Sequence, residues 1–180
     1  MTTLTTQKDL NQELDNQELD FVNLGITADD RQFIIEELNN LLADEHIIYT
    51  KTRNFHWNVT GPMFASLHLL LEEQYNSLQQ TADQIAERVR MLGGEAIGTL
   101  AMFLERTRLP ESPMDKPNAQ TMIGRLLDDH ETLINRLRQD IDVCTDKLHD
   151  EGTADLLIGT MRMHEKTAWM LRAHLQGEAW

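Results

Sequence analysis

The chain has 180 residues and a formal net charge of -14, and both numbers limit what it can be. This length suits one domain of ordinary size with a substantial core. The single cysteine excludes an internal disulfide, and no stretch approaches the ~18 apolar residues of a membrane span. The acidic balance disfavours nucleic acid and anionic membranes as partners and favours cations. Because Cys144 is the only cysteine and the first residues lack the apolar run of a signal peptide, we expect a cytoplasmic protein.

Residues 1–25 are polar and acidic and contain a duplicated sequence, NQELD, at 11–20. This composition predicts a flexible N-terminal tail. Residues 26–176 form the folded domain, because apolar residues recur there at every third or fourth position in four long segments. We expect helices at about 28–58, 62–92, 118–149 and 154–175, followed by a short C-terminal tail at 177–180.

Local signals mark the ends of these helices. Thr27 gives the first helix a start that resembles a capping box, and Pro62 takes the favoured first-turn position of the second. Thr153 is the expected cap of the last helix. The connection at 95–117 is too long for a plain loop, and a short helix is expected inside it at 100–106. These features predict an all-α fold, a four-helix bundle with a long crossover between helices two and three, which is the ferritin-like variant.

A polar stripe runs along the flank of the apolar stripe of the second helix. His68, Glu72 and Asp83 each follow a residue of the apolar stripe by one position, and Glu87 lies one turn beyond Asp83. At ~1.5 Å per residue, His68 and Asp83 are roughly 22 Å apart, whereas metal–ligand bonds are ~2 Å long. Two antiparallel copies of this helix about a two-fold axis would bring the two ends together. With His56 just before the helix, the spacing predicts a metal site completed by dimerisation.

The residue types in this stripe point to iron. Imidazole and carboxylate ligands together suit Fe(II), and mixed nitrogen and oxygen ligation with open positions leaves room for an oxidant. Ferritins proper use a Glu-x-x-His motif on each of two helices. The chain contains no such motif, which argues against an iron centre of the ferritin or bacterioferritin type inside the bundle.

Three sequence motifs stand out: HWNVTG at 56–61, Leu67-His68-x-x-x-Glu72, and Asp83-Gln84-Ile85-Ala86-Glu87-Arg88 before Leu92-Gly93-Gly94. Together they resemble the Dps family (DNA-binding proteins from starved cells), the mini-ferritins of bacteria. The resemblance covers about 30–175. It implies a hollow homo-dodecamer built from two-fold dimers, with His56, His68 and Glu72 from one subunit and Asp83 and Glu87 from its mate. Many family members have Asp where this chain has Glu72.

The resemblance also implies an activity. Family members are ferroxidases that oxidise Fe(II), preferably with hydrogen peroxide, store Fe(III) as a mineral inside the shell and so protect against oxidative stress. Zinc is a further ion that could compete for the site. Trp57 adjoins the site in the family and can intercept stray oxidising equivalents; from the sequence alone it could equally be an interface anchor.

Two weaker hypotheses concern other residues. Asp150, Glu151 and Asp155 could ring a pore for ion entry at a three-fold axis, or they could be ordinary helix-end charges. His164 stands where the family commonly has an apolar residue, so it could be an extra metal ligand.

Each histidine and carboxylate also has a purely structural interpretation. His68 could be an interface histidine, and Glu87 an ordinary solvated helix charge. His130 and Cys144 belong to the apolar stripe of the third helix and are interpreted as packing residues. The five candidate ligands in register, together with the matching residues that flank them, favour the iron site.

An alternative function is a nucleoid-binding protein that protects DNA with little ferroxidase activity. Electrostatic DNA binding needs lysine and arginine to displace counterions from phosphates. The N-terminal tail is acidic and 175–180 contain no base, so we expect weak or no DNA binding.

Overall fold

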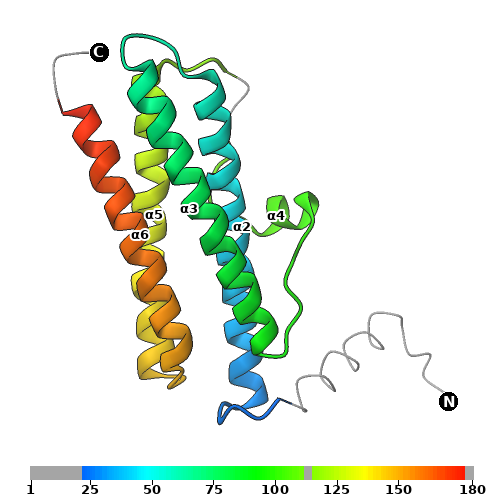
Figure 1. Cartoon of the computed structure of the whole chain (residues 1–180). Coiled ribbons are helices and arrows are strands. Elements are labelled where there is room, and N and C mark those ends of the chain that lie inside the picture. Colours follow the sequence, from blue (N-terminus) through cyan, green and yellow to red (C-terminus); the bar gives the residue numbers. More distant parts are fainter. Residues whose placement is uncertain (1–21, 112–114, 177–180) are drawn as a thin grey trace.

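The protein is described here from a computed structural model that covers residues 22–111 and 115–176. Its helices are α2 (Ala28–Asn58), α3 (Phe64–Met91), α4 (Leu100–Arg106), α5 (Ala119–Asp146) and α6 (Glu151–Leu175). Figure 1 shows two antiparallel hairpins, α2 with α3 and α5 with α6, packed side by side. The long connection from α3 to α5 carries α4 along the outer side of the first hairpin. The predicted all-α four-helix bundle with a short helix in its crossover is confirmed.

The predicted tails fall largely outside this description. Residues 1–21 and 177–180 lie outside the described residues, so the tails predicted at 1–25 and 177–180 stay predictions. Within the described ranges, no helix is long and apolar enough to cross a membrane.

The start of α2 agrees with the sequence signal, whereas the starts of α3 and α6 differ from those predicted. Thr27 caps α2, since its Oγ1 accepts a hydrogen bond from the Asp30 amide at 3.2 Å. Pro62 was wrongly placed in the first turn of a helix, because Gly61 forms a turn with φ +105° and α3 begins only at Phe64. The expected cap of α6 was also wrong. Asp150 caps that helix by accepting from the Thr153 amide at 3.0 Å, which starts α6 three residues earlier.

The apolar stripes form the core between the hairpins. Most of the stripe predicted for the second helix is buried, including Leu67, Leu71, Leu78, Ile85 and Val89. Burying a side chain of this size stabilises a fold by about 1.5–3 kcal/mol. Apolar burial therefore supplies most of the driving force that holds the two hairpins together.

Two ion pairs, one buried and one partly buried, add specific polar links between the hairpins. Lys51 on α2 donates from Nζ to Asp129 on α5 at 2.7 Å and to the Pro110 carbonyl in the crossover at 2.7 Å. Arg88 on α3 pairs with Asp150 at the start of α6, at 2.8 Å. Removing one partner of a buried pair leaves an uncompensated charge, so these contacts fix how the hairpins dock.

A fully buried polar triad crosses the bundle interior. His164 on α6 donates from Nε2 to the Glu45 carboxylate on α2 at 2.7 Å. Its Nδ1 lies 2.7 Å from Nδ1 of His130 on α5. When both rings are neutral and His164 carries its proton on Nε2, His130 must donate this second bond. His130 therefore lies in the core, as predicted, but it is a hydrogen-bonded group and not only a packing residue.

Acidification should destabilise the fold through His130. Burial, and secondarily the neighbouring His164, hold the pKa of His130 well below its usual range. Below about pH 6.5, His130 binds a proton in the unfolded chain but stays neutral in the folded chain. The free energy of unfolding therefore decreases as the pH falls below this value, by at most about 1.4 kcal/mol per pH unit. Two other buried carboxylates of the interior are engaged elsewhere, since Glu45 bonds His164 and Asp129 pairs with Lys51. Urea unfolding between about pH 7.5 and 5.5 would measure it.

Two variants separate this effect from the general titration of the chain. His130→Leu should flatten the pH dependence, whatever it does to the absolute stability. The exposed His149 is the matched control, and His149→Asn should leave the slope intact because asparagine tolerates the left-handed backbone there (φ 52°). A slope unchanged in the His130 variant would refute the assignment.

Candidate metal centre

His56 and His68 form a stacked pair where α2 ends and α3 begins. Their ring centroids are 3.8 Å apart, with the rings 18° from parallel. His56 donates from Nδ1 to the main-chain carbonyl of His68 at 2.8 Å, and His68 donates from Nδ1 to the carbonyl of His56 at 2.9 Å. A carbonyl only accepts, so Nδ1 carries the proton in both rings. In the neutral imidazoles this leaves both Nε2 lone pairs for a metal ion.

The local fold and the neighbouring rings fix the orientation of this pair. The turn at Gly61 reverses the chain, so α3 runs back along the last turns of α2. Phe64 stacks on His68 with centroids 5.1 Å apart, and the edge of Tyr75 packs on His56 at 5.2 Å. Phe64 and Tyr75 belong to the predicted apolar stripe, but they lie at its edge, exposed and half-buried, beside the histidines.

The three acidic candidates occupy different surroundings along α3. Glu72 lies one turn after His68 and is half-buried, with the Tyr75 hydroxyl 3.5 Å from its Oε1. Asp83 and Glu87 are exposed, and neither bonds or pairs with another described residue. Asp83 lines a hollow of about 590 Å³ between α2, α3 and α4.

A single copy of the chain does not assemble a complete metal site. In the residues that the structure describes, no three His, Cys, Asp or Glu side chains lie close enough together to hold a metal ion. The structure brings His56 and His68 together and leaves Asp83 and Glu87 farther down α3. The five-ligand site divided between two copies therefore stays a prediction, with which this geometry is compatible.

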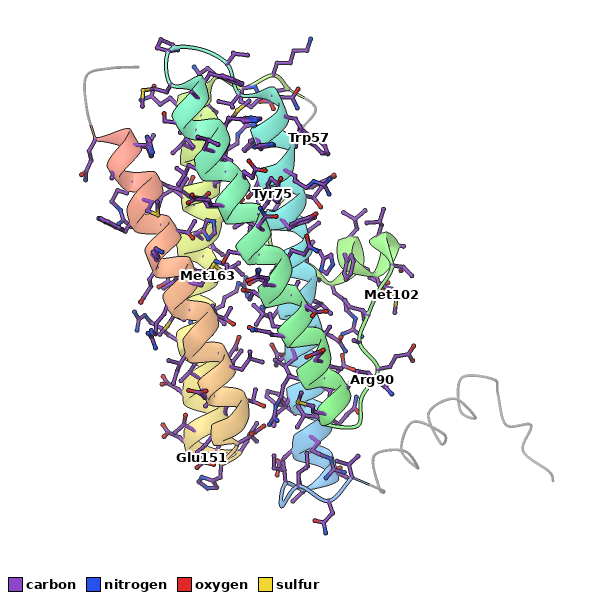
Figure 2. The ribbon with its side chains drawn as sticks, viewed as in Figure 1. Trp57, Tyr75, Arg90, Met102, Glu151 and Met163 are labelled. Atoms are coloured by element: carbon purple, nitrogen blue, oxygen red, sulfur yellow. The ribbon has the colours of Figure 1, made fainter. Side chains whose placement is uncertain are left out.

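An arginine held among three aromatic rings lies next to the histidine pair, and the sequence reasoning missed it. The Arg53 guanidinium carbon is 4.9 Å from the ring centroid of Trp57, 5.6 Å from that of Tyr49 and 5.9 Å from that of Tyr75. Arg53 also donates to the Tyr49 hydroxyl at 2.7 Å. The signal was present, because Tyr49, Arg53 and Trp57 are spaced by four residues and so share one face of a helix. Figure 2 shows Trp57 and Tyr75 toward the end of the first hairpin opposite Arg90.

His164 lies in the bundle interior, where both ring nitrogens are engaged, by Glu45 and by His130. It therefore has no free nitrogen to offer a metal ion in this arrangement.

The three predicted pore residues differ in exposure. The Asp150 carboxylate is buried, bonded to Arg88 and to the hydroxyl and amide of Thr153, and these bonds lower its pKa against the opposing effect of burial. Glu151 and Asp155 are exposed. Only the latter two have carboxylates free to meet an ion in solution.

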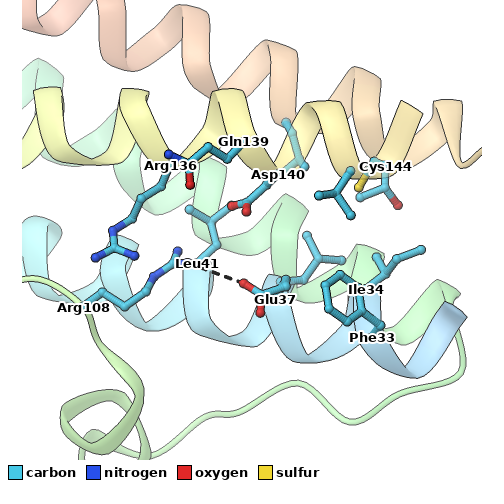
Figure 3. Close-up of a pocket in the computed structure, with 13 residues that line it drawn as sticks. Phe33, Ile34, Glu37, Leu41, Arg108, Arg136, Gln139, Asp140 and Cys144 are labelled. Atoms are coloured by element: carbon cyan, nitrogen blue, oxygen red, sulfur yellow. Dashed lines mark ion pairs between the residues drawn. The ribbon is translucent and has the colours of Figure 1, made fainter. Parts of the chain in front are cut away.

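A separate cavity of about 300 Å³ lies between α2 and α5 (Figure 3). Arg108 and Arg136 lie at one end, and Phe33 and Cys144 lie toward the other, with the ion pair of Arg108 and Glu37 beside it. Burial, reinforced by the carboxylates of Asp150 and Asp140, raises the pKa of the Cys144 thiol to about 11. The thiol is therefore protonated at neutral pH and a poor nucleophile or metal ligand. This agrees with its interpretation as a packing residue.

Comparisons with known proteins agree with the fold and the motifs. A family model described as a ferritin-like domain matches residues 35–178. The chain is 46% identical over 157 residues to an uncharacterized low temperature-induced protein of Nostoc sp., covering 87% of this chain and 88% of the relative. It is 38% identical to the DNA protection during starvation protein of Brevibacillus brevis, covering 81% of this chain and 97% of the relative.

A solved structure of similar fold is described in terms of metal chemistry. The Dps protein of Vibrio cholerae O1, described as a member of a broad superfamily of ferritin-like diiron-carboxylate proteins, superimposes with a TM-score of 0.81. It is 31% identical, and the match covers 86% of this chain and 97% of the other. With the bundle, the crossover helix and the paired histidines in the expected places, the chain belongs to the Dps family of ferritin-like proteins.

Proposed function

We propose that this protein is a ferroxidase and iron store. It oxidises Fe(II), preferably with hydrogen peroxide, and deposits Fe(III) as a mineral inside a hollow homo-dodecamer in the cytoplasm, which protects the cell from oxidative stress. Each site consists of His56, His68 and Glu72 from one subunit and Asp83 and Glu87 from its two-fold mate. Zinc would compete for the same ligands.

The reciprocal bonding of His56 and His68 is the observation that carries this proposal. Each ring uses Nδ1 on the other residue's carbonyl, so both rings keep the tautomer and orientation that a metal ligand needs. A histidine held only for packing has no need of this arrangement. The exposed carboxylates of Asp83 and Glu87, farther along α3, would supply the remaining ligands of the site in the two-fold mate.

Exposed apolar side chains on α2, α3 and α4 support assembly with a second copy. On α4, Leu100 is 77% exposed and Leu104 54%, and Leu69 on α3 is 59% exposed. Trp57, at 63% exposed, adds a large ring next to His56. Large apolar side chains exposed on a single copy are common at protein interfaces, and aromatic anchors are enriched there.

The chemistry follows from the ligand types and from the charge of the protein. Nitrogen and carboxylate ligands stabilise both Fe(II) and Fe(III), and open positions admit peroxide. Peroxide that takes one electron from each of two ferrous ions becomes water, so less hydroxyl radical escapes. The net charge of -14 per chain concentrates cations near the shell, and Glu151 and Asp155 are the exposed carboxylates that could line an entrance.

The alternative, a nucleoid-binding protein with little ferroxidase activity, has less support. The chain carries 30 acidic residues against 16 lysines and arginines, so phosphate contacts would have to overcome general repulsion. We therefore propose iron oxidation, and not DNA binding, as the source of protection.

Stopped-flow absorbance of the apo-protein tests this function. Material sized by gel filtration is mixed with Fe(II), and peroxide or air is added in parallel. We expect rapid growth of ferric absorbance with peroxide, slower growth with air, and a particle close to twelve subunits. Oxidation no faster than in buffer, from an intact shell, would contradict the proposal.

A further inference from the structure

Tyr75 touches two of the three metal ligands that one chain supplies. Its ring packs edge-on against His56 at 5.2 Å, and its hydroxyl lies 3.5 Å from Oε1 of Glu72. The residue lies on α3 and is half-buried. The other tyrosine of the chain, Tyr49, packs edge-on against Tyr75 with ring centroids 6.2 Å apart, and no contact joins it to His56, His68 or Glu72 in the described residues.

We propose that Tyr75 is the electron donor that completes peroxide reduction when a site holds a single ferrous ion. This inference rests on the proposed ferroxidase function and deepens it. Peroxide needs two electrons to become water and hydroxide, and one Fe(II) supplies only one. Without a second donor, the reaction releases hydroxyl radical.

The step balances in atoms and electrons. One Fe(II), one hydrogen peroxide and one Tyr75 phenol give one Fe(III), one hydroxide, one water and one neutral tyrosyl radical. Iron loses one electron and the phenol loses the other. The O–O bond breaks, and the phenolic hydrogen ends in the water molecule. The phenol is suited to this role because its radical is neutral once that hydrogen is lost.

Arg53 explains why Tyr75 takes this role in preference to Trp57. The guanidinium lies 4.9 Å from the indole centroid, closer than to any of the other rings it contacts. Removing an electron from tryptophan first creates a cation radical, which a fixed positive charge at this distance disfavours. Trp57 is also 63% exposed, whereas Tyr75 lies against the ligands. Arg53 thus makes the indole the harder ring to oxidise.

Electron paramagnetic resonance on freeze-quenched samples tests the proposal. Apo-protein is loaded with less than one Fe(II) per site without oxygen, mixed with peroxide and frozen, with a parallel spin-trap assay for hydroxyl radical. Wild-type protein should give a radical whose hyperfine structure changes when ring-deuterated tyrosine is incorporated. Tyr75→Phe should lose this signal and release several-fold more trapped hydroxyl radical. Tyr49→Phe, the matched control, should keep both at their wild-type levels.

The possible outcomes distinguish a failure of the proposed role of Tyr75 from a failure of the proposed ferroxidase function. Equal radical and spin-trap yields in Tyr75→Phe and wild type would overturn the role of Tyr75 while iron oxidation itself stood. A wild-type radical insensitive to tyrosine deuteration would overturn it also. No peroxide-driven iron oxidation at saturating Fe(II) in the wild-type protein would overturn both. If Tyr75 had only a structural role, Tyr75→Phe would leave the tyrosine radical signal unchanged.

Discussion

Replacing both histidines of the pair by glycine should abolish fast iron oxidation while the shell stays intact. In His56→Gly/His68→Gly we expect the rate with peroxide to fall by more than about 100-fold, because loss of outer-shell partners alone costs about 10–100-fold in metal sites. Stopped-flow absorbance gives the rate, and gel filtration gives the size of the particle. Oxidation at the wild-type rate would show that the site lies elsewhere.

The control for this experiment is a glycine substitution away from the site. Glycine in a helix costs roughly 1 kcal/mol, so some loss of stability is expected in the double variant. His149→Gly removes an exposed histidine whose backbone already has a positive φ. It should oxidise iron like the wild type. Circular dichroism on all three proteins separates loss of ligands from loss of fold.

Mixing two inactive variants should restore activity if the site is divided between subunits. The first variant is His56→Gly/His68→Gly and the second is Asp83→Asn/Glu87→Gln. A two-fold dimer with one copy of each contains one site that lacks both ligand sets and one that is fully intact. With random pairing, about one quarter of all sites regain every ligand. We therefore expect about one quarter of the wild-type initial rate from co-expressed, doubly tagged particles.

The homogeneous particles provide the comparison. Each variant expressed alone has no intact site, and mixing the two after separate assembly should give no recovery until subunits exchange. If all five ligands acted within one chain, the co-expressed particle would be as inactive as its parents. This result would leave iron binding possible but would refute the two-fold site.

The fold could be predicted from the sequence because its signals are local. Apolar spacing gave four helices, and Thr27 and the glycines after α3 marked their ends. The two errors at helix starts have one physical cause. A proline and a threonine are each compatible with more than one position near a helix start, and the neighbouring Gly61 and Asp150 decided which one they occupy.

The site could be predicted only in part. The family resemblance implied that His56 and His68 act together in one subunit, and the structure stacks their two rings where α2 ends and α3 begins. The mutual bonding of their rings to main-chain carbonyls leaves no trace in residue spacing. The burial of His164 beside Glu45 could not be foreseen either, because that contact joins residues 119 positions apart.

The two glycines that follow α3 are required for different reasons. Gly93 has a φ of +90°, which side chains rarely adopt, whereas a methyl group on Gly94 would lie 2.7 Å from the side chain of Ile35. Position 94 is therefore constrained by Ile35 on α2, so positions 94 and 35 should change together in evolution. Relatives with alanine at 94 should carry a smaller residue at 35, while position 93 should vary independently of 35. An alignment of Dps sequences tests this directly, and free variation at 35 alongside alanine at 94 would contradict it.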